Sequence, residues 1–445
     1  MRDQGPGKRP PRFPGAVFFW APLCLLGAYL YLELMERFSG LAPRLGEASK
    51  DIAIYRRAGE AILAGRVPYR DFFIEYPPGS LPTFVPPALF SSSREAYASL
   101  FASEMALVLV AALLLTAYAA RSLGRPWPLF PAAVFAAGAL LLYPVAVTRY
   151  DAVVALTLAA TAALCSSPAF GRSSAMGTAA FVAAWASLGI GVAAKLVPAL
   201  VTIPLALVSG RGEGERSFGR VARSATRGFV VFFGVVVAFF LPAFLFGGGD
   251  FVKSFSYHTD RGLQLESLGA SVLLKLGYVE GVFLEFGAYD VQGRGVDLLN
   301  SMSLPVTGVL LILTAVIAYR EYREDRFGPE QFPRFAAAFV LALLLGSKVL
   351  SPQYVIWLLP LVPLSAGGVW GLGAWAVFLA VCWMTTQIFP YHYLEISAGR
   401  PPGTDILLGR NFLLVVLWGL MLSLPPESPA KEPAERAASE QGSPS

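Results

Sequence analysis

The stretch from Ser49 to Gly79, SKDIAIYRRAGEAILAGRVPYRDFFIEYPPG, combines two Asp, two Glu, five basic residues and three Tyr. Asp51, Asp71 and Glu75 therefore lie close together in the chain. Clustered carboxylates at the edge of a membrane are one way to set a general base, a group that removes a proton from a reacting hydroxyl. An Asp at a helix start is also a common N-cap, so both interpretations of Asp51 stay open, although its acidic neighbours favour the base.

The pattern around Asp51 predicts a short helix followed by an irregular loop. Apolar residues recur at helical spacing after Asp51, and Gly65 is placed to end the run. Prolines at 68, 77 and 78 exclude a longer helix, because proline lacks an amide donor and pushes the residue before it toward extended backbone. We expect an amphipathic helix that lies at the bilayer surface.

The composition is that of a membrane protein. Of the 445 residues, 55% are hydrophobic and 15% charged, and the mean hydropathy is +0.58. Cys24, Cys165 and Cys382 all lie in apolar runs, which favours small buried residues over a disulfide or a metal site. The net charge of +5 is not gathered into a dense basic stripe, and this excludes nucleic acid as a partner.

The apolar runs predict an all-α polytopic membrane protein with about 12 transmembrane helices, since a spanning helix needs about 20 apolar residues. We expect one transmembrane domain over 15–424, with disordered cytosolic segments at 1–14 and 425–445. The first outer loop covers 36–97 and holds a second surface helix at 81–90; a large outer loop covers 247–298. The expected spans are 15–32, 100–120, 127–148, 152–170, 175–188, 192–208, 228–246, 299–319, 335–347, two within 349–394, and 411–424.

Orientation follows from the basic residues of the short loops. Those near Arg121, Arg172, 211–227 and 320–334 hold more Lys and Arg than the short connections on the other side, which predicts cytosolic termini and an Asp51 loop outside the cell. Many carboxylates and both histidines then fall on the outer side. We expect a multi-pass protein of a bacterial plasma membrane.

Several motifs together resemble the glycosyltransferase C superfamily, and in particular glycosyltransferase family 87, the polyprenol-phosphate-mannose-dependent mannosyltransferases and their bacterial relatives. The resemblance rests on these residues, in this order: Asp51, Tyr55, Gly59, Leu63, Gly65, Pro68-Tyr69, Asp71, Glu75-Tyr76-Pro77-Pro78, Arg149-Tyr150-Asp151, Lys195, Pro198, His258, Arg261-Gly262, Gln264, Glu266-Ser267, Ser351-Pro352-Gln353-Tyr354, Trp357 and Pro360.

The resemblance implies that Asp51 is the base of an inverting transfer of a sugar, mannose in that family, from a polyprenyl-phosphate donor to a lipid or glycan hydroxyl. Lys195, Arg261 and Lys348 would hold the departing phosphate, because an anionic leaving group needs cations. Sugar or acceptor contacts are expected from Tyr55, Tyr69, Asp71, Glu75, Tyr76, Arg149, Asp151, His258, Gln264, Glu266, Gln353 and Tyr354. No nucleotide or other cofactor is expected, since the sequence has no phosphate-cradling glycine loop. A divalent metal is possible in this superfamily, but the carboxylates lack a compact ligand pattern, so we expect none.

Simpler interpretations remain for several of these residues. Lys348 could equally be a basic side chain that reaches the membrane surface. Arg149 and Asp151 are more easily explained as a pair across a hairpin. Glu104 could bond a neighbouring span or line the acceptor site, and the tyrosines could simply pack.

A secondary transporter or lipid flippase is the alternative function. Such a protein would carry its charges near the bilayer midplane on broken helices, and Gly189-Ile190-Gly191 before Lys195 does resemble a helix break. The transferase hypothesis instead requires Asp51, Lys195, Arg261 and Tyr354 to meet in one outward cavity.

Overall fold

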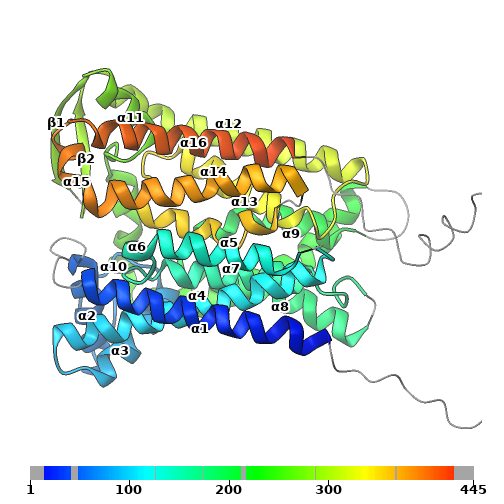
Figure 1. Cartoon of the computed structure of the whole chain (residues 1–445). Helices are drawn as coiled ribbons and strands as arrows, with labels where there is room; N and C mark the ends of the chain where they lie inside the picture. Colours follow the sequence, from blue (N-terminus) through cyan, green and yellow to red (C-terminus); the bar gives the residue numbers. More distant parts are fainter. Residues whose placement is uncertain are drawn as a thin grey trace, which may run out of the picture.

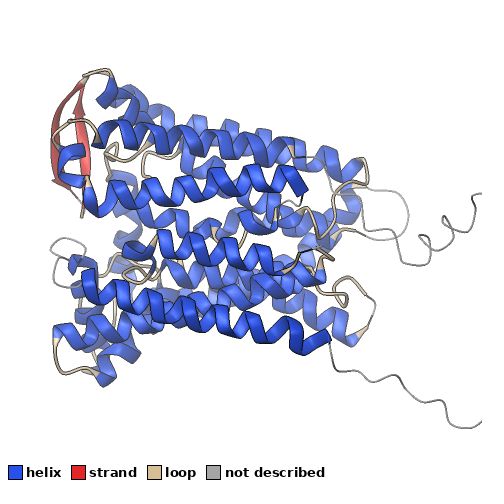
Figure 2. Ribbon diagram, viewed as in Figure 1, coloured by secondary structure: helices blue, strands red, loops and turns tan. Residues whose placement is uncertain are grey.

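The computed structural model describes residues 15–41, 49–125, 127–172, 174–211, 217–285, 287–365 and 368–424. The segments 1–14 and 425–445, predicted to be disordered, lie outside these residues. Within the described part the chain is a bundle of long, roughly parallel helices with a small two-stranded hairpin at one end (Figure 2). The predicted helical membrane fold is confirmed.

Seven of the described helices are long and apolar enough to cross a membrane. They fall in α1 (Gly15–Leu41), α4 (Arg94–Ser122), α8 (Ala175–Ala194), α10 (Phe218–Asp260), α12 (Val296–Arg323), α14 (Gly368–Thr386) and α16 (Gly403–Ser423). Five shorter apolar segments complete the bundle: α5 (Leu129–Leu141), α7 (Asp151–Cys165), 197–209 with α9 (Thr202–Ser209), α13 (Phe332–Gly346) and 352–364. All twelve coincide in order with the predicted spans.

The bundle has two different ends. Helix α1 begins and α16 finishes at one of them, which we call the terminal end (Figure 1). The other end, which we call the α2 end, carries α2 (Ser49–Leu63), α3 (Val85–Phe90), α11 (Leu268–Lys275), α15 (Tyr393–Ser397) and the strands β1 (Val279–Glu285) and β2 (Ala288–Gly293) (Figure 1). The short α6 (Tyr143–Ala146) continues α5 toward this end.

Helix α2 is seated on the bundle through close backbone contacts. A Cβ atom added at Gly59 would lie 2.2 Å from the carbonyl oxygen of Phe84, in the 3₁₀ helix Pro78–Phe84. One added at Gly79 would lie 2.4 Å from the backbone of Ala193, near the end of α8. Tyr55 stacks on the Phe84 ring at 4.5 Å. The predicted surface helix is therefore fixed against the spans.

The structure moves some predicted boundaries. Helix α1 continues to Leu41, past the predicted loop start at residue 36. Helix α10 extends to Asp260 across a non-helical Gly248, whose φ of +54° suits glycine. The large outer loop thus starts as helix and contains the antiparallel β1–β2 hairpin, which the sequence analysis did not predict.

Candidate active site

A cavity of about 750 Å³ opens at the α2 end. Asp51, Lys195, Arg261 and Tyr354 all line it, so the four residues that the transferase hypothesis requires to converge do meet in one cavity. Seven other residues that were predicted to contact the substrates also line the cavity: Glu75, Tyr76, Arg149, Gln264, Glu266, Lys348 and Gln353. Segments from six separate parts of the chain, near residues 51, 76, 149, 195, 264 and 351, thus meet around one space.

Asp51 lies in the first turn of α2, and both of its carboxylate oxygens have partners. Oδ2 forms an ion pair with the Arg149 guanidinium, and Oδ1 accepts a hydrogen bond of 3.0 Å from the Tyr76 hydroxyl. Burial raises the pKa of Tyr76 well above its ordinary value, so this hydroxyl keeps its proton and can donate. The Asp51 side chain is still 29% exposed to the cavity.

Tyr76 is positioned by a cluster of aromatic rings. It meets Tyr55 at 5.4 Å, Tyr150 at 5.3 Å and Phe84 at 5.9 Å, each edge to face. The Tyr55 ring comes from α2, the Tyr150 ring from the turn before α7, and the Phe84 ring from the 3₁₀ helix Pro78–Phe84. The packing fixes the Tyr76 hydroxyl beside Asp51.

Arg149 and Asp151 do not pair with each other across a hairpin, so that interpretation is wrong. Arg149 turns to Asp51, whereas Asp151, 1% exposed at the start of α7, accepts hydrogen bonds of 2.7 Å from Lys195 Nζ and from Trp357 Nε1. Arg149 lines the cavity, whereas Asp151 lies behind the lining and bonds to Lys195, which does line it.

Lys195 lines the cavity. The regular hydrogen bonding of α8 ends here, and Lys195 adopts an extended backbone (φ −161°, ψ 130°). Its ammonium lies 5.1 Å from the Tyr150 ring, 4.9 Å from Tyr354 and 5.2 Å from Trp357. Tyr354 and Trp357 stack at 4.3 Å. A cation held by an aspartate and three aromatic faces is positioned, not merely reaching the membrane surface.

Arg261, Gln264 and Lys348 are tied together by backbone bonds. The Gln264 amide donates to the Lys348 carbonyl at 2.9 Å, and the Gln264 side-chain oxygen accepts from the Leu350 amide at 2.7 Å. Lys348 Nζ donates to the carbonyl of Arg261. Leu265 in turn bonds to Tyr289 of β2 at 2.8 Å, so the unpredicted hairpin holds this segment in place.

Glu266 is 1% exposed and contacts the cavity beside Gln264, whose side-chain nitrogen donates to it. Burial raises the pKa of Glu266 to about 7, against the opposing effect of Arg410 and other cations. Arg410 and Asn411 of α16 each donate to the Glu266 carbonyl at 3.2 Å. The sequence analysis assigned no role to Arg410 and Asn411; a polar pair within an apolar span was the available signal.

Other predicted residues do not line the cavity. Tyr55 is buried in the aromatic cluster, and Tyr69, with a φ of +68°, is buried against Phe251 and donates to the Tyr76 carbonyl at 2.7 Å. Asp71 bonds Arg70 and the Val67 amide, which hold its pKa at about 2. All three support the loop and do not face the cavity.

Two further predictions have different outcomes. The His258 side chain lies outside the described residues. Glu104 does not line the cavity: it lies within α4, and its Oε2 atom is buried without a hydrogen-bond partner in the structure.

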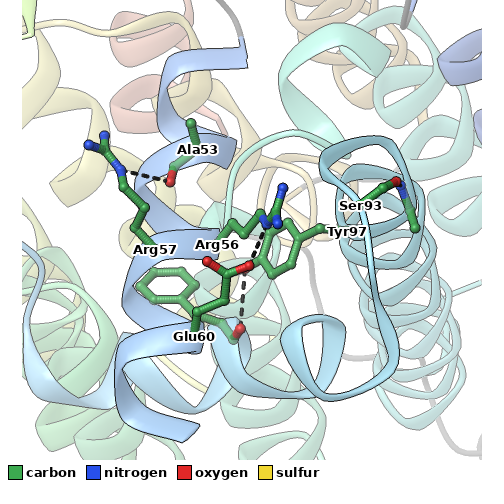
Figure 3. A network of polar contacts seen from close by, with 8 residues as sticks. Ala53, Arg56, Arg57, Glu60, Ser93 and Tyr97 are labelled. Carbon is green, nitrogen blue, oxygen red and sulfur yellow. Dashed lines mark hydrogen bonds and ion pairs between the residues drawn. The ribbon is translucent and has the colours of Figure 1, made fainter. Parts of the chain in front are cut away.

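Basic residues that the sequence analysis did not select also line the cavity mouth: Lys50, Arg57 and Arg94. Figure 3 shows how α2 separates its two arginines, with Arg57 bonded to its own Ala53 carbonyl and Arg56 turned to Glu60 on the other side. Beside them the Tyr97 hydroxyl donates to the Phe84 carbonyl at 3.2 Å, which joins α4 to the α2 end (Figure 3).

The described residues contain no group of three or more His, Cys, Asp or Glu side chains placed to hold a metal ion. The cavity lining instead combines the carboxyl groups of Asp51, Glu75 and Glu266 with several cations. Such an arrangement can accept a proton at one wall and bind an anion at another.

An apolar helical bundle with this charged cavity at one end is the architecture of a multi-pass membrane protein. The chain belongs to Glycosyltransferase family 87, whose sequence model matches residues 73–352. The match includes the cavity residues from Glu75 to Pro352, while Asp51 precedes it. It is therefore a membrane glycosyltransferase.

Among the curated proteins no match was found. Among solved structures, ArnT from Cupriavidus metallidurans is similar in its apo state and bound to undecaprenyl phosphate, both at 15% identity and a TM-score of 0.47. Each alignment covers 92% of this chain, and 78% and 77% of ArnT, respectively. The archaeal oligosaccharyltransferase AglB from Archaeoglobus fulgidus, in complex with an inhibitory peptide and a dolichol-phosphate, is similar at 13% identity and a TM-score of 0.38, over 88% of this chain and 54% of AglB.

Proposed function

We propose that this protein transfers a sugar, mannose as the first candidate, from a polyprenyl-phosphate donor to a hydroxyl of a lipid or glycan acceptor. The observation that carries the proposal is the convergence of Asp51 and the three cations Lys195, Arg261 and Lys348 on one cavity. An inverting transfer needs a base on one side of the anomeric carbon and charge stabilisation for the leaving group on the other. This cavity provides both kinds of group.

In the proposed reaction, Asp51 takes the proton of the acceptor hydroxyl, and that oxygen attacks the anomeric carbon. The bond from this carbon to the phosphate oxygen breaks, and its electron pair leaves with polyprenyl phosphate. Lys195, together with Arg261 and Lys348, which are joined through the Arg261 carbonyl, stabilises the charge that develops on the phosphate. Attack from the side opposite the phosphate inverts the anomeric configuration.

The remaining cavity residues are proposed to orient the sugar or acceptor. Glu75, Gln264 and Gln353 offer polar side chains. Tyr354, which stacks on Trp357, offers an aromatic ring that lines the cavity. Sugars bind well to such mixed surfaces because their C–H faces pack on rings while their hydroxyls need hydrogen-bond partners.

We place the protein in the plasma membrane of a bacterium, within the cell envelope, with both termini cytosolic. The cavity lies at the end of the bundle opposite to the start of α1 and the finish of α16. With the termini inside, the cavity faces outward, where a nucleotide-independent lipid donor suits the chemistry. Cysteine substitution at exposed Arg70, labelled in intact cells with a membrane-impermeant maleimide, tests this orientation; labelling only after lysis contradicts it.

The experiment that tests the function is sugar transfer from radiolabelled polyprenyl-phosphate mannose in membranes that contain the wild type or Asp51→Asn at matched levels of folded protein. We expect the wild type to label a lipid or glycan and the variant to be slower by about 100-fold or more, the contribution of a general base. Labelling from another lipid-phosphate sugar alone would retain the class and overturn mannose. Silence with every donor would favour transport of a lipid-linked sugar instead.

Metal independence is a further part of the proposal. Turnover should continue in excess EDTA, because the anionic leaving group is matched by side-chain cations. Loss of turnover that added Mg²⁺ or Mn²⁺ restores would contradict it.

A further inference from the structure

Both oxygens of the Asp51 carboxylate already have a partner within the protein. Its Oδ2 is paired with Arg149, and its Oδ1 accepts a hydrogen bond of 3.0 Å from the Tyr76 hydroxyl. An acceptor hydroxyl must hydrogen-bond a carboxylate oxygen before it can lose its proton. Each oxygen has two lone pairs, so one on each is still open; loosening the Arg149 contact would open Oδ2 fully to the acceptor.

Arg149 is the partner that can respond to a substrate. Tyr76 is locked by its ring cluster, whereas the Arg149 guanidinium lines the same cavity as Lys195 and Arg261. The Cζ atom of Arg149 also lies 6.0 Å from the centre of the Phe389 ring. A planar guanidinium also matches a phosphate with two parallel hydrogen bonds.

The other cations already have fixed partners within the protein. Lys195 is bound to Asp151, which is itself held by Trp357, and Lys348 donates to a backbone carbonyl. Arg149, in contrast, is paired with the very group that must become available. The Arg149 charge also acts electrostatically on the carboxyl of Glu266, which lines the same cavity.

We propose that Arg149 couples donor binding to the release of the base. The donor phosphate competes with Asp51 for the guanidinium, and its arrival frees Oδ2 to accept the hydrogen bond of the acceptor hydroxyl. Arg149 is in this sense a positioning residue for Asp51 as well as a phosphate ligand. This inference rests on the proposed function, since it takes a lipid-linked phosphate as the ligand.

Competition makes an unusual prediction for binding. Asp51→Asn removes the charge that holds Arg149, so the variant should bind polyprenyl phosphate about 5-fold or more tightly than the wild type, the scale of a close charge pair. The affinity is measured with the full chain in lipid nanodiscs and polyprenyl phosphate as the probe. Arg149→Met should weaken binding, and Asp51→Asn should add little tightening, under about 2-fold, in the Arg149→Met background.

Two controls separate coupling from general effects. Glu75→Gln removes another cavity carboxylate, and it should tighten binding less than Asp51→Asn and by the same factor with or without Arg149. Tyr76→Phe removes the uncharged partner of Asp51 and should change phosphate affinity much less than Asp51→Asn does. Arg149→Lys keeps the charge and serves as the check if Arg149→Met folds poorly.

The outcomes are distinct. Binding of polyprenyl phosphate with equal tightening by Asp51→Asn in both backgrounds overturns the coupling and leaves the proposed function standing. No binding of polyprenyl phosphate in any variant overturns the lipid-phosphate donor and the coupling together. Tightening that depends on Arg149 supports both.

Discussion

The two ends of the bundle use the same ion-pair chemistry for different purposes. At the terminal end, Arg334 of α13 pairs with Glu321 of α12 and donates to the Leu424 carbonyl after α16. Both side chains are buried there, and neither lines the cavity. At the α2 end, Asp51 pairs with Arg149 and Lys195 pairs with Asp151, but here both Asp51 and Lys195 line the cavity.

Further bonds at the terminal end join chain segments to one another. Tyr322 donates to the Gly210 carbonyl at 3.1 Å, and Arg125 donates to the Leu364 carbonyl at 2.6 Å. These contacts hold helix ends together, whereas the pairs at the α2 end hold charges where a substrate can reach them. The difference teaches that access, and not the type of pair, separates a structural ion pair from a functional one.

The largest effect is expected from a substitution of Lys195, at the α2 end. Lys195→Met should slow transfer by about 10² to 10³-fold, because a cation that stabilises the leaving phosphate is lost. It should also destabilise the fold by about 3–5 kcal/mol, since Asp151 is left charged and buried. Initial rates and thermal unfolding in detergent measure the two effects.

A second change tests that assignment. Adding Asp151→Asn to Lys195→Met removes the uncompensated charge, so stability should recover while transfer stays slow. Recovery of both would show that Lys195 acts only through the fold.

The matching change at the terminal end should separate stability from activity. Arg334→Met should cost about 3–5 kcal/mol of stability, because Glu321 loses its buried partner, while turnover per folded molecule stays near that of the wild type. Thermal unfolding and active-site-normalised rates measure this. A loss of turnover as large as that of Lys195→Met would erase the distinction between the two ends.

A smaller effect should come from pH through Glu266, whose pKa of about 7 lies above its ordinary value. The folded protein then holds this proton more tightly than the unfolded chain, so the contribution to stability falls as pH rises from about 4.5 through about 7. Deprotonation also adds a negative charge to the wall of the anion site. KM for the donor should therefore rise about threefold or more above pH 7.

Glu266→Gln provides the comparison for this pH effect. The variant should keep a nearly constant KM for the donor from pH 5.5 to 8.5, because its side chain cannot ionise. The same rise in KM in wild type and variant would assign the effect to another group.

Much of the site could be predicted because its residues break the apolar pattern. Asp51, Lys195, Arg261 and Lys348 stand out at helix ends, and all four line the cavity. The loop residues Tyr69 and Asp71 stood out for the same reason, yet they bond within their own segment. Polarity in a membrane chain thus marks candidates without separating substrate ligands from local supports.

The hairpin was missed although a signal was present. Residues 279–293 carry short runs of branched and aromatic residues around Gly287, the pattern of two strands and a turn. The sequence analysis assigned these residues to the large outer loop 247–298 instead. The hairpin matters because Leu265 and Val291 join the segment of Arg261 to β2.

The sequence by itself determined the membrane bundle, the order of its spans and the end at which its charges gather, because hydropathy and helix-breaking residues act locally along the chain. Only the tertiary structure decided which charges pair. Arg149 turns to Asp51, and Asp151 receives Lys195 together with a tryptophan 206 positions away. Such contacts depend on how distant helix ends are packed, and local patterns carry no information about that packing.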